Sequence, residues 1–448
     1  MIVEWSKLIS TKRLGQPTSD KASPPRTEFT RDYDRIIFSS AFRRLQDKTQ
    51  VFPLAKSDYV RTRLTHSLEV ASVGRSLGVL AGDAMLGKDS ALATIIAPQE
   101  IGTIVATACL MHDIGNPPFG HAGESAIREW FDGFKSRISD TGMNAAEEQD
   151  LLQFEGNAQG FRTLCVLQNQ PQLGGLQLTH AVLGTFIKYP RESLVASFHT
   201  SGISGKKFGF MQSEAALFQE LADELGLVRK PGEQLAWHRH PLAFLVEAAD
   251  DICYHVMDVE DGFKAGVLAY QELKALHKPW LTPEQMEKAE KIEDAQRRAE
   301  YFRAVSLNAM VREMIGVFKS NYEGLMTGSF DEELSVHIPR ASEFEAFKNL
   351  AKAKVYNARP VVEVEACGFE VIGGLLDAFV SALEVKAKNV GVRVARSRTL
   401  LSLLPHCGAS SDSQSLYGRI MIATDFVAGM TDSYAVELYQ RIRGISLP

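Results

Sequence analysis

Residues 110–118 read Leu110-Met111-His112-Asp113-Ile114-Gly115-Asn116-Pro117-Pro118, an apolar helical run that delivers a His-Asp pair. The glycine and the two prolines after the pair do not continue a helix, so the pattern predicts that both side chains stand at a helix end. An imidazole and a carboxylate can bind one divalent cation from the same turn, but two ligands make a weak site. Further ligands must therefore come from elsewhere in the chain. The alternative is a chance occurrence, because a lone His-Asp dipeptide is common.

Two distant polar residues, His66 and Asp250, are candidates for the missing ligands. Each lies in a stretch where apolar residues recur at helical spacing. Burial of an unpaired neutral polar group costs roughly 2–7 kcal/mol, so each side chain needs a partner in the fold. A divalent metal shared by His66, His112, Asp113 and Asp250 would satisfy all four. This mixed nitrogen and oxygen set suits Mn, Fe, Co, Ni or Mg better than a thiolate-preferring zinc site.

His121 and Glu124 form the candidate acid/base unit. They are three residues apart at the start of a predicted helix, so their side chains can meet. A carboxylate that holds one tautomer of the imidazole would leave His121 able to protonate a departing alkoxide. The alternative interpretation is a contact that caps the N-terminus of the helix.

Tyr254 and Asp258 follow Asp250 at successive steps of four on the same predicted helix. All three therefore share one helix face. A tyrosine and a carboxylate beside a metal can pack against a sugar and hydrogen-bond it. In an ordinary helix, Tyr254 would instead be a core residue and Asp258 a surface residue.

Composition bounds the class of protein. The chain has 448 residues, of which 45% are hydrophobic, and a formal net charge of −6, which argues against a uniformly basic nucleic-acid surface. The five cysteines are scattered and odd in number, so neither a disulfide framework nor a Cys-rich zinc site is indicated. We find no export signal and no uninterrupted apolar run of membrane-spanning length, so we expect a cytoplasmic protein without membrane insertion.

Helical spacing dominates the chain and predicts a mainly α fold. We expect helices over 32–46, 64–82, 98–113, 122–134, 156–168, 242–259 and 282–305. The alternation in 361–366, with Val371 and Ile372 as partner, predicts a small β-hairpin. Flexible insertions are expected at 134–150, 199–212 and 404–416. We predict an N-terminal arm (1-28), a helical core that carries the candidate metal ligands (29-265) and a helical C-terminal region packed on it (266-448).

With these residues in view, the chain resembles the bacterial dGTPases, the deoxyguanosine triphosphate triphosphohydrolases of the HD superfamily. The order His, then His-Asp, then a distant Asp is typical of that superfamily. The likeness covers most of residues 26 to 440. It runs through the stretches 35–46, 48–53, 61–69, 112–124, 154–160, 248–261 and 429–432.

The resemblance implies a fold and a set of residue roles. The fold would be an HD helical core, with His66, His112, Asp113 and Asp250 around one divalent metal ion. Other roles carried over are phosphate contact by Arg63, binding of the sugar 3′-hydroxyl by Gln50 and Asp258, packing of Tyr254 on deoxyribose, and triphosphate contacts by Lys188, Tyr189 and Lys207. A 2′-hydroxyl would clash with Tyr254. The lysines have an alternative interpretation as ordinary surface residues.

The implied activity is hydrolysis of deoxynucleoside triphosphates, with dGTP favoured, to a deoxynucleoside and inorganic triphosphate. The regions 130–150 and 268–360 match the family poorly and bear on base recognition. The alternatives are another HD phosphohydrolase, such as a nucleotidase or phosphodiesterase, and a nucleotide or DNA sensor with a structural HD site. The family also implies a homo-oligomer, hexamer or tetramer, and in some members single-stranded DNA binding, for which Arg393, Arg396 and Arg398 are candidates.

Overall fold

Helices account for nearly all the regular structure in the computed structural model. It describes residues 3–16, 26–51, 61–88, 91–138, 140–169, 172–388, 394–405 and 415–446. The first ten α-helices are α1 (Trp5–Leu8), α2 (Glu28–Phe38), α3 (Ser40–Arg44), α4 (Arg63–Lys88), α5 (Pro98–Met111), α6 (Gly120–Lys135), α7 (Ala145–Leu152), α8 (Gly156–Arg162), α9 (His180–Phe186) and α10 (Ala215–Leu225). The others are α11 (Ala243–Lys264), α12 (Tyr270–His277), α13 (Pro283–Glu290), α14 (Ala295–Ser320), α15 (Tyr322–Thr327), α16 (Ala341–Leu350), α17 (Arg359–Lys388), α18 (Val394–Leu401), α19 (Leu416–Ala428) and α20 (Asp432–Arg443). The predicted mainly α fold is confirmed.

Helices α4 and α5 pack closely because glycines recur on α4 at every fourth position. Gly74, Gly78 and Gly82 share one face of α4. A Cβ at Gly78 would lie 2.8 Å from the Cα of Gly102, and one at Gly82 would lie 2.8 Å from the Cα of Pro98. The glycine face therefore lets the two backbones approach, which brings the N-terminal end of α4 beside the C-terminal end of α5.

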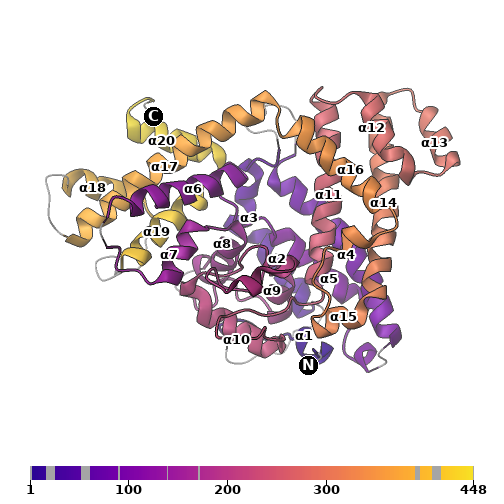
Figure 1. The fold of residues 1–448 in the computed structure, drawn as a ribbon, viewed down its shortest axis with the longest axis horizontal. Coiled ribbons are helices and arrows are strands. Elements are labelled where there is room, and N and C mark those ends of the chain that lie inside the picture. The colour runs from indigo at the N-terminus through magenta and orange to yellow at the C-terminus, as the bar shows by residue number, and fades with distance from the viewer. Residues whose placement is uncertain are drawn as a thin grey trace.

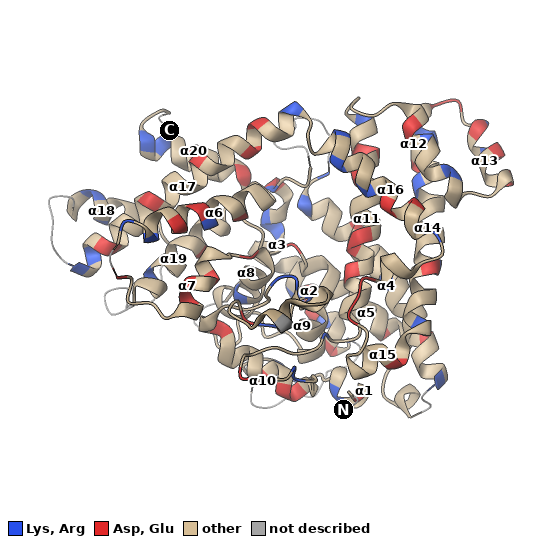
Figure 2. Cartoon of the chain, in the orientation of Figure 1, with Lys and Arg blue, Asp and Glu red and all other residues tan. Residues whose placement is uncertain are grey.

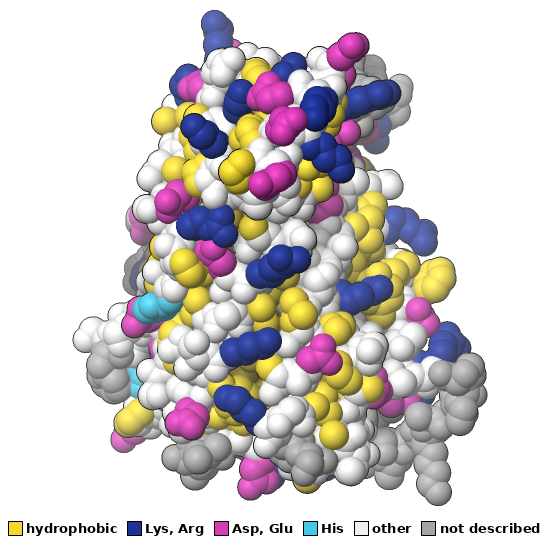
Figure 3. Space-filling model, turned by 90° about the vertical axis from the view of Figure 1, so that its right-hand side faces the viewer, with side chains coloured by type: hydrophobic (Ala, Val, Ile, Leu, Met, Phe, Trp, Pro, Cys, Tyr) yellow, Lys and Arg dark blue, Asp and Glu magenta, His cyan; other side chains and the backbone are white. Residues whose placement is uncertain are grey.

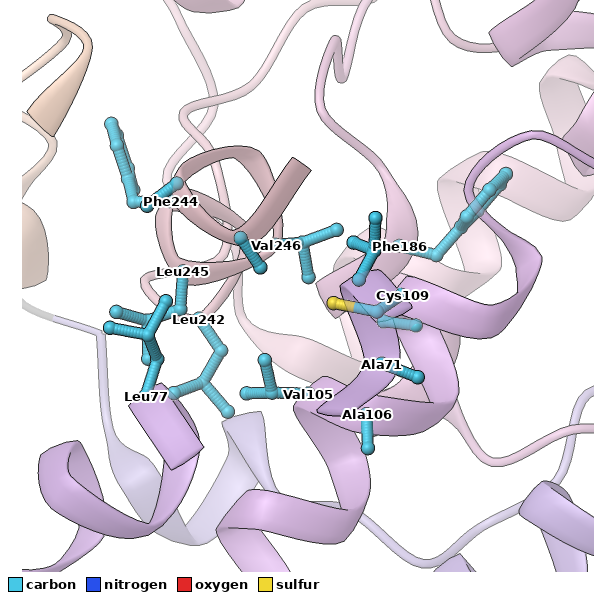
Figure 4. Packing of buried hydrophobic residues seen from close by; sticks show 14 of the residues in the cluster. Ala71, Leu77, Val105, Ala106, Cys109, Phe186, Leu242, Phe244, Leu245 and Val246 are labelled. Atoms are coloured by element: carbon cyan, nitrogen blue, oxygen red, sulfur yellow. The ribbon is translucent and has the colours of Figure 1, made fainter. Parts of the chain in front are cut away.

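Two apolar clusters stabilise the fold. Figure 4 shows part of the larger cluster, in which side chains of α4 and α5 meet those at the start of α11. The smaller cluster joins α6 and α7 to α17, α19 and α20. Figure 1 shows α17 running beside α6 along one edge of the molecule. Residues on both sides of the predicted boundary at 265 thus share one core, and the three-part division of the chain stays a prediction.

The predicted β-hairpin is wrong, because its residues belong to α17. Within the described residues the structure has isolated β-bridges and no sheet. The buried residues of α17 recur at steps of three and four over its whole length, from Val361 through Val371, Ile372 and Leu375. The Val-Glu alternation covers too few residues to compete with this longer helical pattern. Pro360 lies in the first turn of α17, where a missing N–H costs nothing.

Helix α17 passes a length and composition test for a membrane span. Half of its most apolar window is buried inside the molecule, and its apolar face contributes Ile372, Leu376 and Phe379 to the smaller cluster. This packing is that of a core helix.

Other predicted segments also differ in detail. The stretch 282–305 is split between α13 and α14, because the Asp294 side chain caps α14 by accepting the Arg297 N–H at 2.8 Å. The predicted insertion 134–150 contains α7, and the insertion 199–212 carries buried Phe208, Phe210 and Met211. Most of 404–416 lies outside the described residues.

The N-terminal segment is anchored to the rest of the fold. Trp5, Leu8 and Leu14 are buried in the larger cluster. Arg13 forms buried ion pairs with Glu28 and Asp32, at 2.6 and 2.5 Å. Residues 17–25 lie outside the described part of the chain.

Candidate active site

The predicted site residues converge on one cavity of about 570 Å³. It lies where the N-terminal end of α4, the C-terminal end of α5 and the middle of α11 meet. The predicted residues that line it are Gln50, Arg63, His66, His112, Asp113, His121, Lys188, Tyr189, Lys207, Asp250 and Tyr254. Glu124 and Asp258 are buried behind the wall. Figure 2 shows acidic residues along α11, the helix that carries Asp250 and Asp258.

Three candidate metal ligands meet at one point. The Oδ1 atom of Asp250 lies 3.2 Å from Nε2 of His66 and 3.3 Å from Nε2 of His112. The three donor atoms lie within 4.8 Å of one another. Asp113 stands at the edge of this group, with its Oδ1 atom 3.5 Å from Nε2 of His112.

Neighbouring groups orient these donors. Nδ1 of His112 donates to the backbone carbonyl of Cys109 at 2.7 Å, which leaves the lone pair of Nε2 available to a metal ion. Asp113 accepts from Asn116 and Arg63, each at 2.6 Å. Two buried imidazoles and two carboxylates with fixed orientations fit a divalent cation that prefers nitrogen and oxygen donors.

The turn after the His-Asp pair is closely packed. A Cβ at Gly115 would collide with the backbone of Gly156 and Gly160 on α8. Phe119 has a positive φ of 63°, an uncommon conformation for a non-glycine residue. Its N–H donates to Asp432 at the start of α20, at 3.0 Å. The turn is therefore held from two sides, and it delivers the next helix, α6, to the cavity.

The predicted pair His121 and Glu124 is hydrogen-bonded. Nδ1 of His121 donates to Oε2 of Glu124 at 3.0 Å, and the Gly156 N–H donates to Oε1 of Glu124 at 2.7 Å. The His121 side chain is 76% exposed, whereas Glu124 is 4% exposed. Burial raises the pKa of Glu124, but the hydrogen bond from His121 and the charge of Lys207 outweigh it and leave that pKa below its ordinary value. An ionised Glu124 thus anchors an accessible imidazole.

Cationic side chains of the cavity pair with carboxylates. Lys188 donates to Oδ2 of Asp250 at 2.6 Å, and Lys207 donates to Glu155 at 2.9 Å. Burial lowers the pKa of each lysine, but the neighbouring carboxylates more than offset it and raise both pKa values. Both side chains stay charged near neutral pH, as anion binding requires.

The predicted sugar-binding residues form a wall that includes a tyrosine not anticipated from the sequence. The Tyr356 hydroxyl donates to Oδ2 of Asp258 at 2.6 Å, and the rings of Tyr254 and Tyr356 lie 5.7 Å apart. Burial raises the pKa of Asp258 well above its ordinary value. Oε1 of Gln50 is buried and has no hydrogen-bond partner among the described residues.

Sequence reasoning missed further residues of the cavity, among them Glu155, Tyr356 and Glu365. Tyr356 follows η9 (Ala351–Val355) within a stretch that shows no motif, and Glu365 lies in the segment predicted as a hairpin. Only Glu155 carried a signal, because it lies in the motif stretch 154–160.

Comparisons with known proteins identify the family of this chain. The chain matches the HD domain over residues 63–155 and the phosphohydrolase-associated domain over residues 334–441. A deoxyguanosinetriphosphate triphosphohydrolase-like protein of Synechocystis sp. is 43% identical over 458 residues, which cover 99% of this chain and 100% of the relative. A protein of the same description from Pseudomonas aeruginosa is 38% identical, with full coverage of both chains. A deoxyguanosinetriphosphate triphosphohydrolase of Klebsiella pneumoniae is 32% identical over 94% of this chain and 96% of the relative.

The HD domain, its associated domain and the His-His-Asp cluster define an HD-domain phosphohydrolase. Within that class, the chain belongs to the deoxyguanosinetriphosphate triphosphohydrolase family of the HD superfamily.

Proposed function

We propose that this enzyme hydrolyses deoxynucleoside triphosphates to a deoxynucleoside and inorganic triphosphate, with dGTP preferred. The observation that carries the proposal is the single cavity in which a candidate metal centre, an acid/base pair, charged lysines and a tyrosine-lined wall lie together. These groups suit the parts of one nucleotide: the metal centre and the acid/base pair suit the α-phosphate, the lysines suit the outer phosphates, and the tyrosine-lined wall suits the sugar. The names of the full-length relatives support the same substrate class.

His66, His112, Asp113 and Asp250 would hold one divalent cation, which we expect to be Mn, Mg, Fe, Co or Ni. When bound there, it would supply Lewis-acid polarisation of a phosphoryl oxygen and lower the pKa of a bound water. Lys188 contacts the Asp250 oxygen that faces away from the histidines. It therefore limits the rotation of this carboxylate.

His121 acts as the general acid in the proposed reaction. Water adds to the α-phosphorus, the bond from phosphorus to the 5′-oxygen breaks, and the imidazolium of His121 transfers its proton to that oxygen. Glu124 accepts from Nδ1 and stabilises the charged ring, so Nε2 carries the proton that is transferred. Because the inner bond breaks, the three phosphates leave as one unit.

Arg63, Lys188, Tyr189 and Lys207 contact the triphosphate in this proposal. The positive charges of Arg63 and the two lysines neutralise the charge that builds up on the phosphoryl oxygens during bond cleavage. Arg63 is buried and lies 2.6 Å from Asp113, so its guanidinium is fixed next to the metal centre. We expect the α-phosphate to bind between this guanidinium and the candidate metal ion.

The sugar wall selects deoxyribose. Gln50 and Asp258 would bind the 3′-hydroxyl. The buried Oε1 of Gln50 has no hydrogen-bond donor among the described residues, and Asp258 lies behind the wall, where it accepts from Tyr356. Tyr254 packs against C2′ and leaves no room for a 2′-hydroxyl. The hydrogen bond from the Tyr356 hydroxyl limits the rotation of the Asp258 carboxylate.

We propose that Glu365 recognises guanine. This exposed residue of α17 is among those that line the cavity, together with Val51, Val361 and Val364. An ionised carboxylate accepts two hydrogen bonds side by side. Among the four DNA bases, guanine offers two adjacent N–H donors, N1–H and the 2-amino group, on one edge. Glu365 therefore supports dGTP as the preferred substrate.

Product analysis tests the proposal. Metal-free enzyme is incubated with each deoxynucleoside triphosphate and each candidate cation, and the products are separated by ion exchange. We expect deoxyguanosine and inorganic triphosphate in equal amounts. Release of orthophosphate or a monophosphate product would favour another HD phosphohydrolase, and tight nucleotide or DNA binding without turnover would favour a sensor.

A homo-oligomer, single-stranded DNA binding and a cytoplasmic location stay predictions. Of the arginines named for DNA binding, Arg396 and Arg398 are exposed on α18, and Arg393 lies outside the described residues. On the face shown in Figure 3, basic, acidic and hydrophobic side chains are interspersed.

A further inference from the structure

Glu155 is a buried carboxylate at the edge of the cavity that the proposed reaction does not use. It immediately precedes α8, and only 2% of its surface is exposed. A buried charge requires partners, because desolvation otherwise costs several kcal/mol. Glu155 has them in Lys207 at 2.9 Å, Asn157 at 2.8 Å and Arg128 at 3.5 Å.

Glu155 determines where the ammonium group of Lys207 stands. A lysine side chain has a flexible stem of four carbons and adopts many rotamers unless its end is held. The ion pair with Glu155 provides that restraint at the cavity wall. The neighbouring Lys206 provides a contrast: its side chain is 62% exposed, and it lies 3.8 Å from Glu333.

The same turn also holds the partner of His121. Gly156, the next residue, donates its N–H to Glu124 at 2.7 Å. Arg128 lies 3.9 Å from Glu124 and 3.5 Å from Glu155, and its Nε donates to the Phe154 carbonyl at 2.8 Å. The turn at Glu155 and Gly156 thus contacts Lys207 directly and His121 through Glu124.

We propose that Glu155 is a positioning residue that holds the ammonium of Lys207 against the leaving triphosphate. The turn that carries Glu155 also supports His121, through Glu124. The role rests on the proposed function. Glu155 has the same sign of charge as the triphosphate, so its direct effect on ground-state binding would be unfavourable. Its contribution is to the transition state, in which a correctly placed cation stabilises the charge that moves onto the leaving phosphates.

Glu155→Gln keeps the shape of the side chain and removes the charge that restrains Lys207. We expect kcat for dGTP to fall about 10- to 100-fold, the cost of a misplaced catalytic-site cation. The KM and the inhibition constant of inorganic tripolyphosphate should change less than about threefold, because a repulsive charge is removed while the lysine remains. A merely structural defect would weaken tripolyphosphate binding and manganese binding as well.

A double-mutant cycle shows whether Glu155 acts through Lys207. Lys207→Met should lower kcat strongly in the wild-type background and by less than about threefold in Glu155→Gln, since coupled residues are non-additive. Glu148→Gln is the matched control, because Glu148 also forms an ion pair with a lysine, Lys135 at 2.6 Å. This pair does not line the cavity. Glu148→Gln should leave kcat unchanged. If Glu155→Gln does not fold, Glu155→Asp, which draws the carboxylate back from Lys207, should show the same loss of kcat.

The outcomes separate this proposal from the proposed function. If the wild-type enzyme releases no inorganic triphosphate, the proposed function fails. If the wild-type enzyme does release it, but Glu155→Gln retains full kcat or the effects of the two substitutions simply add, the positioning role of Glu155 is overturned.

Discussion

At the scale of single residues, His121 is the side chain on which the proposed chemistry depends most. It is accessible, and its only role in the proposed reaction is proton transfer. We therefore expect His121→Ala to lower kcat about 10²- to 10⁴-fold while manganese and nucleotide binding are retained. Steady-state kinetics with dGTP and equilibrium dialysis with Mn²⁺ measure the two effects, and His337→Ala serves as a control at an exposed histidine. Full activity of the variant would remove His121 from the mechanism.

Glu365 provides a residue-scale test of base recognition. Glu365→Gln turns a charged double acceptor into an amide with one acceptor, so one of the two guanine N–H groups loses its partner. We expect the preference for dGTP over dATP in kcat/KM to fall about 10-fold, within the range for loss of a charge-assisted hydrogen bond. Glu363→Gln, two residues earlier on an exposed face of α17 where Glu363 pairs with Arg359, is the control. An unchanged preference in Glu365→Gln would place base recognition elsewhere.

The candidate metal ligands were predictable to different degrees. His112 and Asp113 stand out because a helix-stopping sequence follows them. His66 and Asp250 required the resemblance, since only their order along the chain links them to the motif. Tyr356 reaches the cavity because η9 packs on α11, and Glu365 because α17 packs beside α6, and neither tertiary contact has a local sequence signal. The hairpin prediction is wrong at the same place, because the short Val-Glu alternation in 361–366 lies within a longer helical pattern.

At the scale of helices, Gly115 tests the close contact between the His-Asp turn and α8. A methyl group there would press on the backbone of Gly156 and Gly160, which cannot turn aside as a side chain can. We expect Gly115→Ala to lower the free energy of unfolding by about 1–3 kcal/mol and to lower activity, because α8 also positions Glu124.

Gly316 is the matched position for this test. It lies inside α14, and an added Cβ would meet nothing within 4 Å. Gly316→Ala should therefore raise the free energy of unfolding by about 0.5–1 kcal/mol, through the higher helix propensity of alanine. Chemical denaturation of both variants measures the difference. Equal stability of Gly115→Ala and the wild type would contradict the tight packing of the turn.

At the scale of the whole molecule, buried histidines make stability depend on pH. Burial lowers the pKa of His240 to about 4 and that of His277 to about 3. In the unfolded chain an imidazole takes up its proton near pH 6.5, so below that pH the unfolded state binds more protons than the folded state. We expect the free energy of unfolding to fall as the pH drops from about 6.5 to about 4, and to show no contribution from these groups above pH 6.5.

His277→Gln tests this dependence, because it removes a titrating group that stacks on Phe302 and donates or accepts at Ser306. Its overall stability should be lower, but its free energy of unfolding should fall less steeply between pH 6.5 and 4 than that of the wild type. His337→Gln, at the exposed histidine, should retain the wild-type slope. Identical slopes for all three proteins would contradict the assignment.

The fold brings three candidate metal ligands together, His66 from α4, His112 from the turn after α5 and Asp250 from α11, with Asp113 at the edge of the group. Equilibrium dialysis with Mn²⁺ tests this most directly. Wild-type protein should bind about one Mn²⁺ per chain at the site, and Asp250→Ala, which removes the oxygen shared by both imidazoles, should bind none there. If Asp250→Ala bound Mn²⁺ with the stoichiometry and affinity of the wild type, the metal centre would not be where His66, His112 and Asp250 meet.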